Sequence, residues 1–247
     1  MIPKTSHRFS GLPSRSIPVF AALLAALPLK AAVLQPVSSS GLAKNGTLVT
    51  TTAATHRVGS AATDGNGRNM LVSFQLPDFG AVANPFTSAS LGLYLDGKSG
   101  TPFSFNVDLY GLAAQGTSAL PTGAYYEGAT VDSSPGVSLI QQDFAITTTS
   151  NGSSVTTSAI VGNVNLLNYL NAQYAGGAGA LQYVVFRLNP DVGNPGTAAI
   201  GYNFGSAQNP GSAGLPSLTY EAIPESATGA LLLVSGGFVI VRRRRRN

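Results

Sequence analysis

Short stretches in which apolar and polar residues alternate are the feature that most constrains the fold of this 247-residue chain. The clearest runs from Phe103 to Tyr110 (FSFNVDLY), where every second residue is large and apolar. A period of two is that of a β-strand with one face in a core. The same period, or a short apolar run, predicts further strands at residues 48–52, 69–76, 88–95, 181–188, 198–204 and 215–220.

Turn-forming residues separate these stretches. The chain has 29 Gly and 15 Pro, and clusters such as Asp-Gly-Asn-Gly at residues 64–67 mark turns. One segment has helical spacing instead, because Asn163 can cap a helix in which Val164, Leu167 and Leu170 recur on one face.

Many short strands and one short helix predict an all-β fold, a single jelly-roll-type β-sandwich over residues 47–221. Residues 32–46 are expected to be a linker. The polar stretch at residues 147–158 (TTTSNGSSVTTS) is either a flexible loop or a weak strand at the edge of the sheet.

The N-terminal residues 1–31 predict a secretory signal peptide. Three basic and no acidic residues precede Ile17–Leu29, which is uncharged and shorter than the ~20 residues of a membrane-spanning helix. Small residues then follow at Ala31 and Ala32. Cleavage after Ala31 places Leu29 at position −3, whereas cleavage after Ala32 would place Lys30 there, so we expect cleavage after Ala31.

The C-terminal residues 222–247 predict a short hydrophobic helix with a basic stop. Ala227–Val241 is uncharged, and a helix of this length falls short of a ~30 Å hydrocarbon core. Arginines cross a membrane only at high cost, so the cluster would remain cytoplasmic. The cluster consists of Arg242, Arg243, Arg244, Arg245 and Arg246.

This tail resembles the PEP-CTERM sorting signal, in which a Pro-Glu-Pro motif precedes an apolar segment and an arginine cluster. Pro224 and Glu225 match the motif, and Ser226 stands where Pro is usual. The resemblance implies export by a Gram-negative bacterium that makes extracellular polysaccharide. It also implies transient inner-membrane anchoring and cleavage by an exosortase-like transpeptidase, after a signal peptidase has acted. The alternative is a surface protein that keeps its C-terminal membrane anchor.

A net charge of +4 and a pI of about 9.5 are typical of proteins that bind nucleic acid. The positions of the charged residues along the chain do not favour that interpretation. Nine of the 14 basic residues lie in the two terminal segments. Residues 31–241, which include Glu225 but exclude these nine, have five basic residues and all ten acidic ones, a net charge of −5. The exported body is therefore acidic, and nucleic acid is not an expected partner.

Enzyme signatures are scarce in this sequence. The absence of cysteine excludes disulfides, thiolate zinc sites, iron–sulfur clusters and thiol catalysis. His56, the one histidine outside the signal peptide, is interpreted as an ordinary surface or loop residue. Since no nucleophile-elbow, P-loop or dinucleotide motif is present, we expect no enzyme. The alternative is a polysaccharide hydrolase that uses Glu127, beside Tyr125 and Tyr126.

Two kinds of ligand fit the remaining residues. Asp64 and Asn66 offer oxygens for a structural Ca²⁺ in a Gly-rich loop, which is otherwise a plain turn, and no other cofactor is expected. Exposed aromatic rings bind sugars, and the candidates for glycan contact are Tyr94, Tyr110, Tyr125 and Tyr126.

The order of these features resembles the DNRLRE-type domain, a jelly-roll relative of carbohydrate-binding modules. Six stretches carry the likeness, and the family's tryptophans and several of its arginines are missing, so the likeness implies the fold more than a ligand. The stretches are residues 71–77 (LVSFQLP), 87–95 (TSASLGLYL), 106–111 (NVDLYG), 163–171, 181–188 and 215–220 (LPSLTY).

Together these features predict an exported, non-catalytic protein of the cell surface or extracellular matrix. Its expected role is structural or adhesive, or weak binding of extracellular polysaccharide.

Overall fold

The computed structural model describes residues 31–49, 53–60, 67–80, 82–101, 103–174, 181–196, 199–208 and 214–223. Several predicted features lie outside these residues: most of the signal peptide, the loop with Asp64 and Asn66, the sorting motif Pro224–Ser226 and the basic stop Arg242–Arg246.

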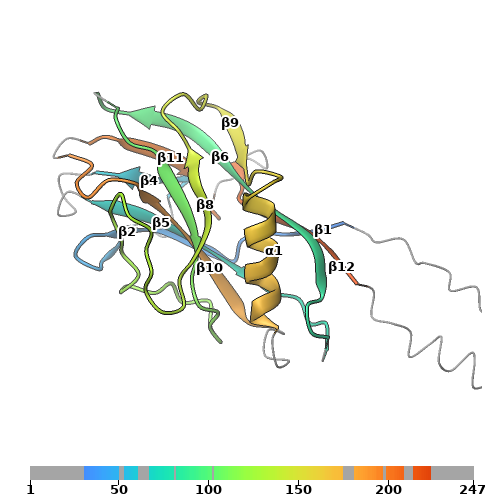
Figure 1. The fold of residues 1–247 in the computed structure, drawn as a ribbon. Helices are drawn as coiled ribbons and strands as arrows, with labels where there is room; N and C mark the ends of the chain where they lie inside the picture. The colour runs from blue at the N-terminus through green and yellow to red at the C-terminus, as the bar shows by residue number, and fades with distance from the viewer. Residues whose placement is uncertain are drawn as a thin grey trace, which may run out of the picture.

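The described residues form twelve strands and one helix (Figure 1). The strands are β1 (Ala32–Leu34), β2 (Ser38–Ala43), β3 (Leu48–Val49), β4 (Thr55–Gly59), β5 (Arg68–Gln75), β6 (Phe86–Ser99), β7 (Val107–Gly111), β8 (Ser138–Ala145), β9 (Ser153–Thr156), β10 (Tyr183–Pro190), β11 (Gly201–Gly205) and β12 (Ser217–Ala222). The helix α1 (Gly162–Gln173) follows β9. The predicted all-β character with one short helix is confirmed.

All strand pairs are antiparallel and join into one curled sheet, in the order β1-β12-β6-β11-β4-β5-β10-β7-β8. In addition, β9 pairs with β6, and β2 pairs with both β5 and β3. A single residue pair, Gly59 with Arg68, joins β4 to β5. The sheet therefore has two halves, one around β6 and one around β10, which meet at this corner (Figure 1).

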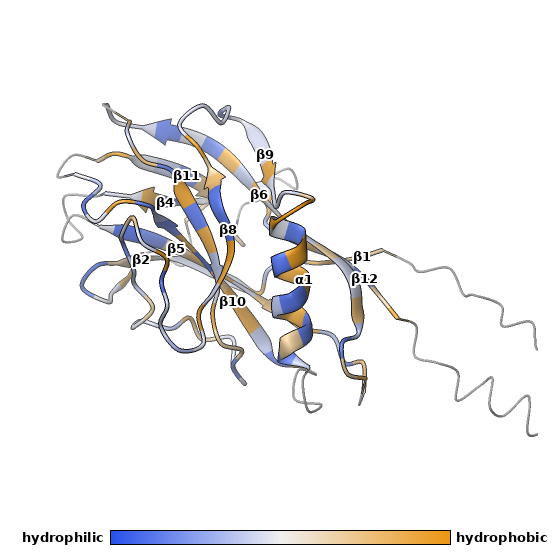
Figure 2. Ribbon diagram, viewed as in Figure 1, coloured by the Kyte–Doolittle hydropathy of each residue, from blue (hydrophilic) through white to orange (hydrophobic). Residues whose placement is uncertain are grey.

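One hydrophobic core fills the concave side of the curled sheet. Alternate residues of β6, from Ala89 through Leu91 and Leu93, belong to the same buried cluster as Val184 and Phe186 of β10. Figure 2 shows the corresponding alternation of hydrophobic and hydrophilic residues along the strands. Because the two halves share this cluster, the sheet curls around one core.

The β10 half is also covered on its outer side. Val185 belongs to a second buried cluster with Leu42, Leu71, Leu112 and Leu120. The last two residues come from the long segment between β7 and β8, which lies over this face. A strand buried on both faces needs apolar residues in an unbroken run, which explains the predicted interior strand at residues 181–188.

The helix α1 packs against β6 and β8 (Figure 1). Its N-cap is Val161, so the prediction that Asn163 caps the helix is wrong; Ser158 instead accepts the Gly162 N–H through its Oγ. Inside, the Tyr169 hydroxyl donates to the Leu112 carbonyl at 2.5 Å. No helix in the described ranges has the length and hydropathy needed to cross a bilayer.

Several predicted boundaries need correction. Residues 32–46, expected to be a linker, contain β1 and β2, which pair with β12 and β5. Residues 103–106 lie outside β7, although Phe103 and Phe105 pack on the core. Within residues 147–158, the weak-strand alternative is confirmed by β9. The strands β4 and β8 were not predicted.

Candidate functional site

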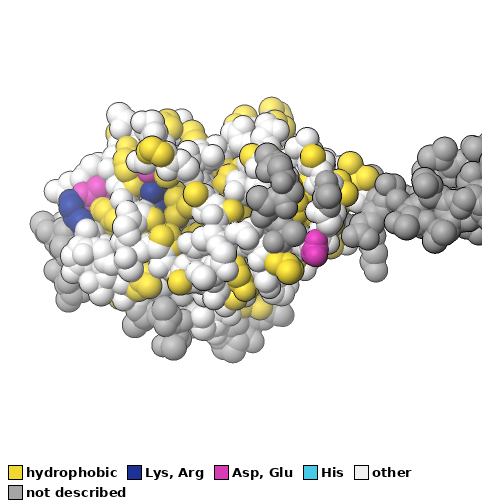
Figure 3. Space-filling view, turned by 90° about the horizontal axis from the view of Figure 1, so that it is seen from below, with side chains coloured by type: hydrophobic (Ala, Val, Ile, Leu, Met, Phe, Trp, Pro, Cys, Tyr) yellow, Lys and Arg dark blue, Asp and Glu magenta, His cyan; other side chains and the backbone are white. Residues whose placement is uncertain are grey.

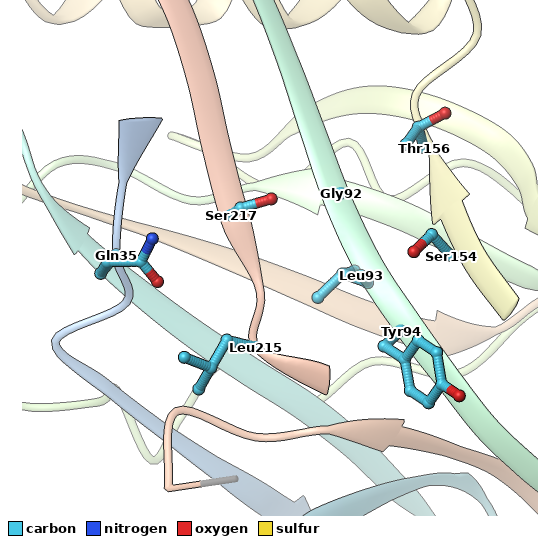
Figure 4. A pocket seen from close by; sticks show the side chains of 8 residues that line it. All are labelled: Gln35, Gly92, Leu93, Tyr94, Ser154, Thr156, Leu215 and Ser217. Carbon is cyan, nitrogen blue, oxygen red and sulfur yellow. The ribbon is translucent and has the colours of Figure 1, made fainter. Parts of the chain in front are cut away.

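An open groove of about 320 Å³ lies on the outward face of β6 (Figure 4). Gly92 of β6 is paired with Ser217 of β12 on one side and with Thr156 of β9 on the other. Tyr94 is paired with Ser154 of β9. The residues that line the groove are Gln35, Gly92, Leu93, Tyr94, Ser154, Thr156, Leu215 and Ser217.

The strand period and one glycine create this hollow. Leu91, Leu93 and Leu95 point into the core, so Gly92 and Tyr94 face outward. A Cβ atom at Gly92 would lie 3.2 Å from the Ser217 Oγ. Without that atom the backbone of β6 forms the floor of the groove, and the Tyr94 ring and the neighbouring hydroxyls form its walls (Figure 4).

The polar groups around the groove are free to meet a ligand. Within the described part of the chain, the hydroxyls of Tyr94, Ser154, Thr156 and Ser217 have no hydrogen-bond partner. None of the described residues that line the groove is charged. Hydroxyl groups both donate and accept hydrogen bonds, so the groove matches an uncharged ligand that also carries hydroxyl groups. Of the four predicted glycan-contact tyrosines, Tyr94 alone lies here.

Tyr110 does not reach the surface, so its prediction as a glycan contact is wrong. Its side chain is fully buried on the outer face of β7, beside Arg187 of β10. The guanidinium carbon lies 4.9 Å from the centre of the Tyr110 ring. The Tyr110 hydroxyl accepts the Asp132 N–H at 3.3 Å. Tyr110 alternates away from the core, as predicted, but the segment between β7 and β8 covers it.

Arg187 is the centre of this buried polar cluster. It donates from Nη2 to Asp132 at 2.7 Å, from Nη1 to the Ala124 carbonyl at 2.9 Å and from Nε to Asn189 at 3.2 Å. Burial lowers the pKa of Arg187, and its bonds to Asp132 oppose that change. Although burial also disfavours the charged form of Asp132, hydrogen bonds from Ser134 and Arg187 keep its pKa below the ordinary value.

The cluster fixes the segment between β7 and β8 onto the sheet, and the sequence patterns did not predict it. Its signal was a single charged residue, Arg187, inside the apolar run VVFRL. A buried arginine needs a carboxylate and further acceptors, so this position alone predicts a buried partner.

Tyr125, Tyr126 and Glu127 also have partners within the fold. The Tyr125 hydroxyl donates to Glu127 at 2.5 Å, and Lys44 forms an ion pair with the other oxygen of that carboxylate. Burial, followed by the contact with Glu127, raises the pKa of Tyr125. The ring of Tyr126 lies 5.2 Å from the guanidinium carbon of Arg187. These residues hold one loop in place and do not contribute to the groove on β6.

Three aspartates accept hydrogen bonds near the start of β7. Asp108 accepts the Asp143 N–H at 2.9 Å, Asp191 accepts the Asn106 N–H at 2.9 Å, and Asp143 accepts the Asn106 side-chain amide at 2.8 Å. Burial, with the nearby charges of Asp191 and Asp143, raises the pKa of Asp108 to about 6. Among the described residues, no three acidic or histidine side chains form an arrangement able to hold a metal ion.

His56 is buried in β4, so its interpretation as a surface or loop residue is wrong. Its Nε2 lies 3.1 Å from the Ser39 Oγ of β2. Burial, with a smaller contribution from the charge of Arg68, lowers the pKa of His56 to about 4. The imidazole is therefore neutral at pH 7 and joins two strands.

The two ends of the described domain lie side by side. Ala31 and Ala32, the predicted cleavage residues, stand at the start of β1. This strand pairs with β12, with Ala32 opposite Tyr220. Because antiparallel neighbours run in opposite directions, the chain enters the sheet beside the point where it leaves at Ile223 (Figure 1). The predicted sorting motif starts at the next residue.

Comparison with known proteins finds no family model that matches the chain and no curated protein similar to it.

Proposed function

We propose that this chain is an exported, non-catalytic protein of the cell envelope or extracellular matrix, with a structural or adhesive role that includes weak carbohydrate binding. The observation that carries the proposal is the groove on β6. Its free hydroxyls and its single aromatic ring suit a sugar, which presents hydroxyl groups together with apolar ring faces.

The ligand that fits the groove best is a neutral polysaccharide. The described residues that line the groove have no charged side chain to pair with the carboxylates or sulfates of an acidic polymer. Figure 3 shows a different face of the domain, seen from below, on which the described residues have few charged side chains. A shallow, open site buries little of the surface of a ligand, so a single site should bind weakly. Many copies of the protein along one polysaccharide would then bind more tightly than one copy.

The arrangement of the chain ends supports export and sorting. If a signal peptidase cuts after Ala31 and an exosortase-like enzyme acts near Pro224, both reactions occur at one edge of the sheet. The domain would then have the same orientation at the inner membrane whether the signal peptide or the C-terminal tail attaches it. For the fold, we propose that the two halves of the curled sheet form the jelly-roll sandwich of DNRLRE-type domains.

The hydrolase alternative finds less support. A glycosidase needs two carboxylates across the scissile bond, and the groove residues that the structure describes include no Asp or Glu. Both oxygens of Glu127 have partners inside the fold.

Affinity electrophoresis against a panel of neutral and acidic polysaccharides tests the proposal. The Gly92→Val substitution fills the groove and should abolish retardation of the protein by a neutral polymer. Gly97→Val is the matched control, because a Cβ at Gly97 of the same strand would meet no atom within 4 Å. Retardation that survives Gly92→Val, or no retardation by any polymer, would exclude this groove as a glycan site.

A further inference from the structure

The junction between the predicted signal peptide and β1 lies beside a carboxylate. The register pairs Ala32 with Tyr220 and Val33 with Thr219, and its continuation places Ala31 opposite Glu221. Ala31 and Glu221 line one hollow of about 160 Å³, together with residues of β6, β12 and the first turn of α1. Ser88 also lines it and donates from its Oγ to Glu221 at 3.2 Å.

Glu221 has no ion-pair partner among the described residues. It is also the only titratable side chain among the seven residues that line the hollow. The strand β1 and the helix α1 contain no charged residue, and the charged residues of β6, Asp96 and Lys98, lie at the opposite end of that strand. Tyr220, the neighbour of Glu221, packs in the core.

Cleavage after Ala31 changes the chemistry of this hollow. Water adds across the Ala31–Ala32 peptide bond, so that Ala31 departs with a carboxylate and the Ala32 nitrogen becomes an α-amino group. Its ordinary pKa is about 7.7–8.0, so at neutral pH most of it is a cation. Before cleavage the same nitrogen is an uncharged amide.

We propose that removal of the signal peptide creates an ion pair between the new α-ammonium group of Ala32 and the carboxylate of Glu221. This inference rests on the proposed export of the protein. The pair fixes β1 against β12 beside the predicted sorting motif. A strand of three residues gains little from pairing alone, and without β1 the strand β12 would be an open edge able to pair with other chains. Cleavage of the signal peptide before Ala32 thus stabilises the pairing of β12 at the C-terminal end of the domain.

A thermodynamic cycle with four proteins tests the pair. Two chains that both extend to Asn247 differ only at the N-terminus. One starts at Ala32, and the other has two serines and Ala31 before it, so that the Ala32 nitrogen is an amide. Each is made with Glu221 and with Glu221→Gln, and all are purified in detergent with the C-terminal residues retained. Thermal unfolding is measured at pH 6.5 and pH 9.5.

At pH 6.5, the Ala32-start chain should melt about 2 °C above the extended chain, as expected for a partly exposed ion pair in a domain of this size. Glu221→Gln should remove the difference, whereas Asp96→Asn, at the far end of β6, should leave it. At pH 9.5 the difference should vanish, because the ammonium group loses its proton.

Two results would overturn the ion pair: equal melting temperatures with Glu221 present, or a difference that persists in Glu221→Gln. N-terminal sequencing of the protein exported by its own cell separates this failure from failure of the export proposal. A first residue other than Ala32 refutes the predicted cleavage site. A chain that begins at Ala32, together with melting temperatures that do not depend on the N-terminus and Glu221 jointly, refutes the ion pair alone.

Discussion

Arg187 of β10 donates a hydrogen bond of 2.7 Å to Asp132, and both side chains are almost completely buried. Asp132 belongs to the segment between β7 and β8, which covers the outer face of β10. The rings of Tyr110 and Tyr126 also contact the guanidinium group. This ion pair ties the covering segment to β10, and the ring contacts explain why Tyr110, which alternates toward the outside of β7, and Tyr126, in the covering segment, are engaged within the fold.

Loss of the arginine should destabilise the protein strongly. The Arg187→Met substitution leaves the Asp132 carboxylate buried without its cation, and removal of one partner of a buried pair costs about 3–5 kcal/mol. Arg57→Met, a matched change at a less buried arginine of β4, should cost no more than about 1 kcal/mol. The free energy of unfolding in urea measures both. Similar values for the two variants would contradict the role given to Arg187.

A methyl group at Gly111 should also be costly. A Cβ there would lie 2.6 Å from the Tyr169 ring, and the hydrogen bond from Tyr169 to the Leu112 carbonyl prevents the ring from moving away. Overpacking of this kind costs about 1–3 kcal/mol, so Gly111→Ala should lower the midpoint of urea unfolding. Gly97→Ala, in open space on β6, is the control and should have a much smaller effect. If Gly111→Ala is no worse than this control, the Tyr169 ring does not pack against Gly111 as tightly as the structure shows.

Asp108 should make the fold more stable as the pH falls below neutral. Burial raises its pKa to about 6 in the folded state, against about 3.9 in an unfolded chain. Between these values the folded state binds more protons, so stability rises as the pH falls from 7 to 4. Asp108→Asn keeps an oxygen for the Asp143 N–H and should stabilise the protein at pH 7 by about 1–3 kcal/mol. A neutral or destabilising result at pH 7 would show that the charged carboxylate is well accommodated.

His56 should lower the stability of the fold as the pH falls from 7 to 4, opposite to the effect of Asp108. Its pKa is lowered to about 4, whereas an unfolded histidine titrates near 6.5. The unfolded state therefore binds more protons between pH 6.5 and 4, and the contribution of His56 to stability is lost as the pH falls. In His56→Gln, which retains a group able to bond to Ser39, stability should fall less between pH 7 and 4 than in the unmodified protein. Identical pH profiles would mean that His56 is not held in its neutral form.

The sequence predicted the strands of the main core well and the covered outer face poorly. Alternation over 69–76 and 88–95 located β5 and β6, because side chains on one face of each strand enter one core. Alternation says nothing about what lies over the other face, which is why Tyr110 and Tyr94 were grouped together although one is buried and the other borders the groove. The short strand β1 has too few residues for a pattern. Its place is set by pairing with β12, where the partner of Ala32 is Tyr220, near the opposite end of the domain.

The groove itself was only partly predictable. Tyr94 was identified as an outward-facing aromatic residue, but its neighbours Ser154, Thr156 and Ser217 come from two other strands. Their arrangement depends on strand registers that local sequence does not specify. In contrast, Gly92 stood in the middle of a predicted strand, and a glycine at such a position indicates a close approach or a missing side chain.

The intact mass of the protein recovered from the surface or culture medium of its own cells tests the central claim most directly. Export and sorting predict a chain that begins at Ala32 and has lost Arg242–Arg246 through cleavage near Pro224. A chain that still has these five arginines would contradict sorting by cleavage, and one that still has residues 1–31 would contradict export through a signal peptide.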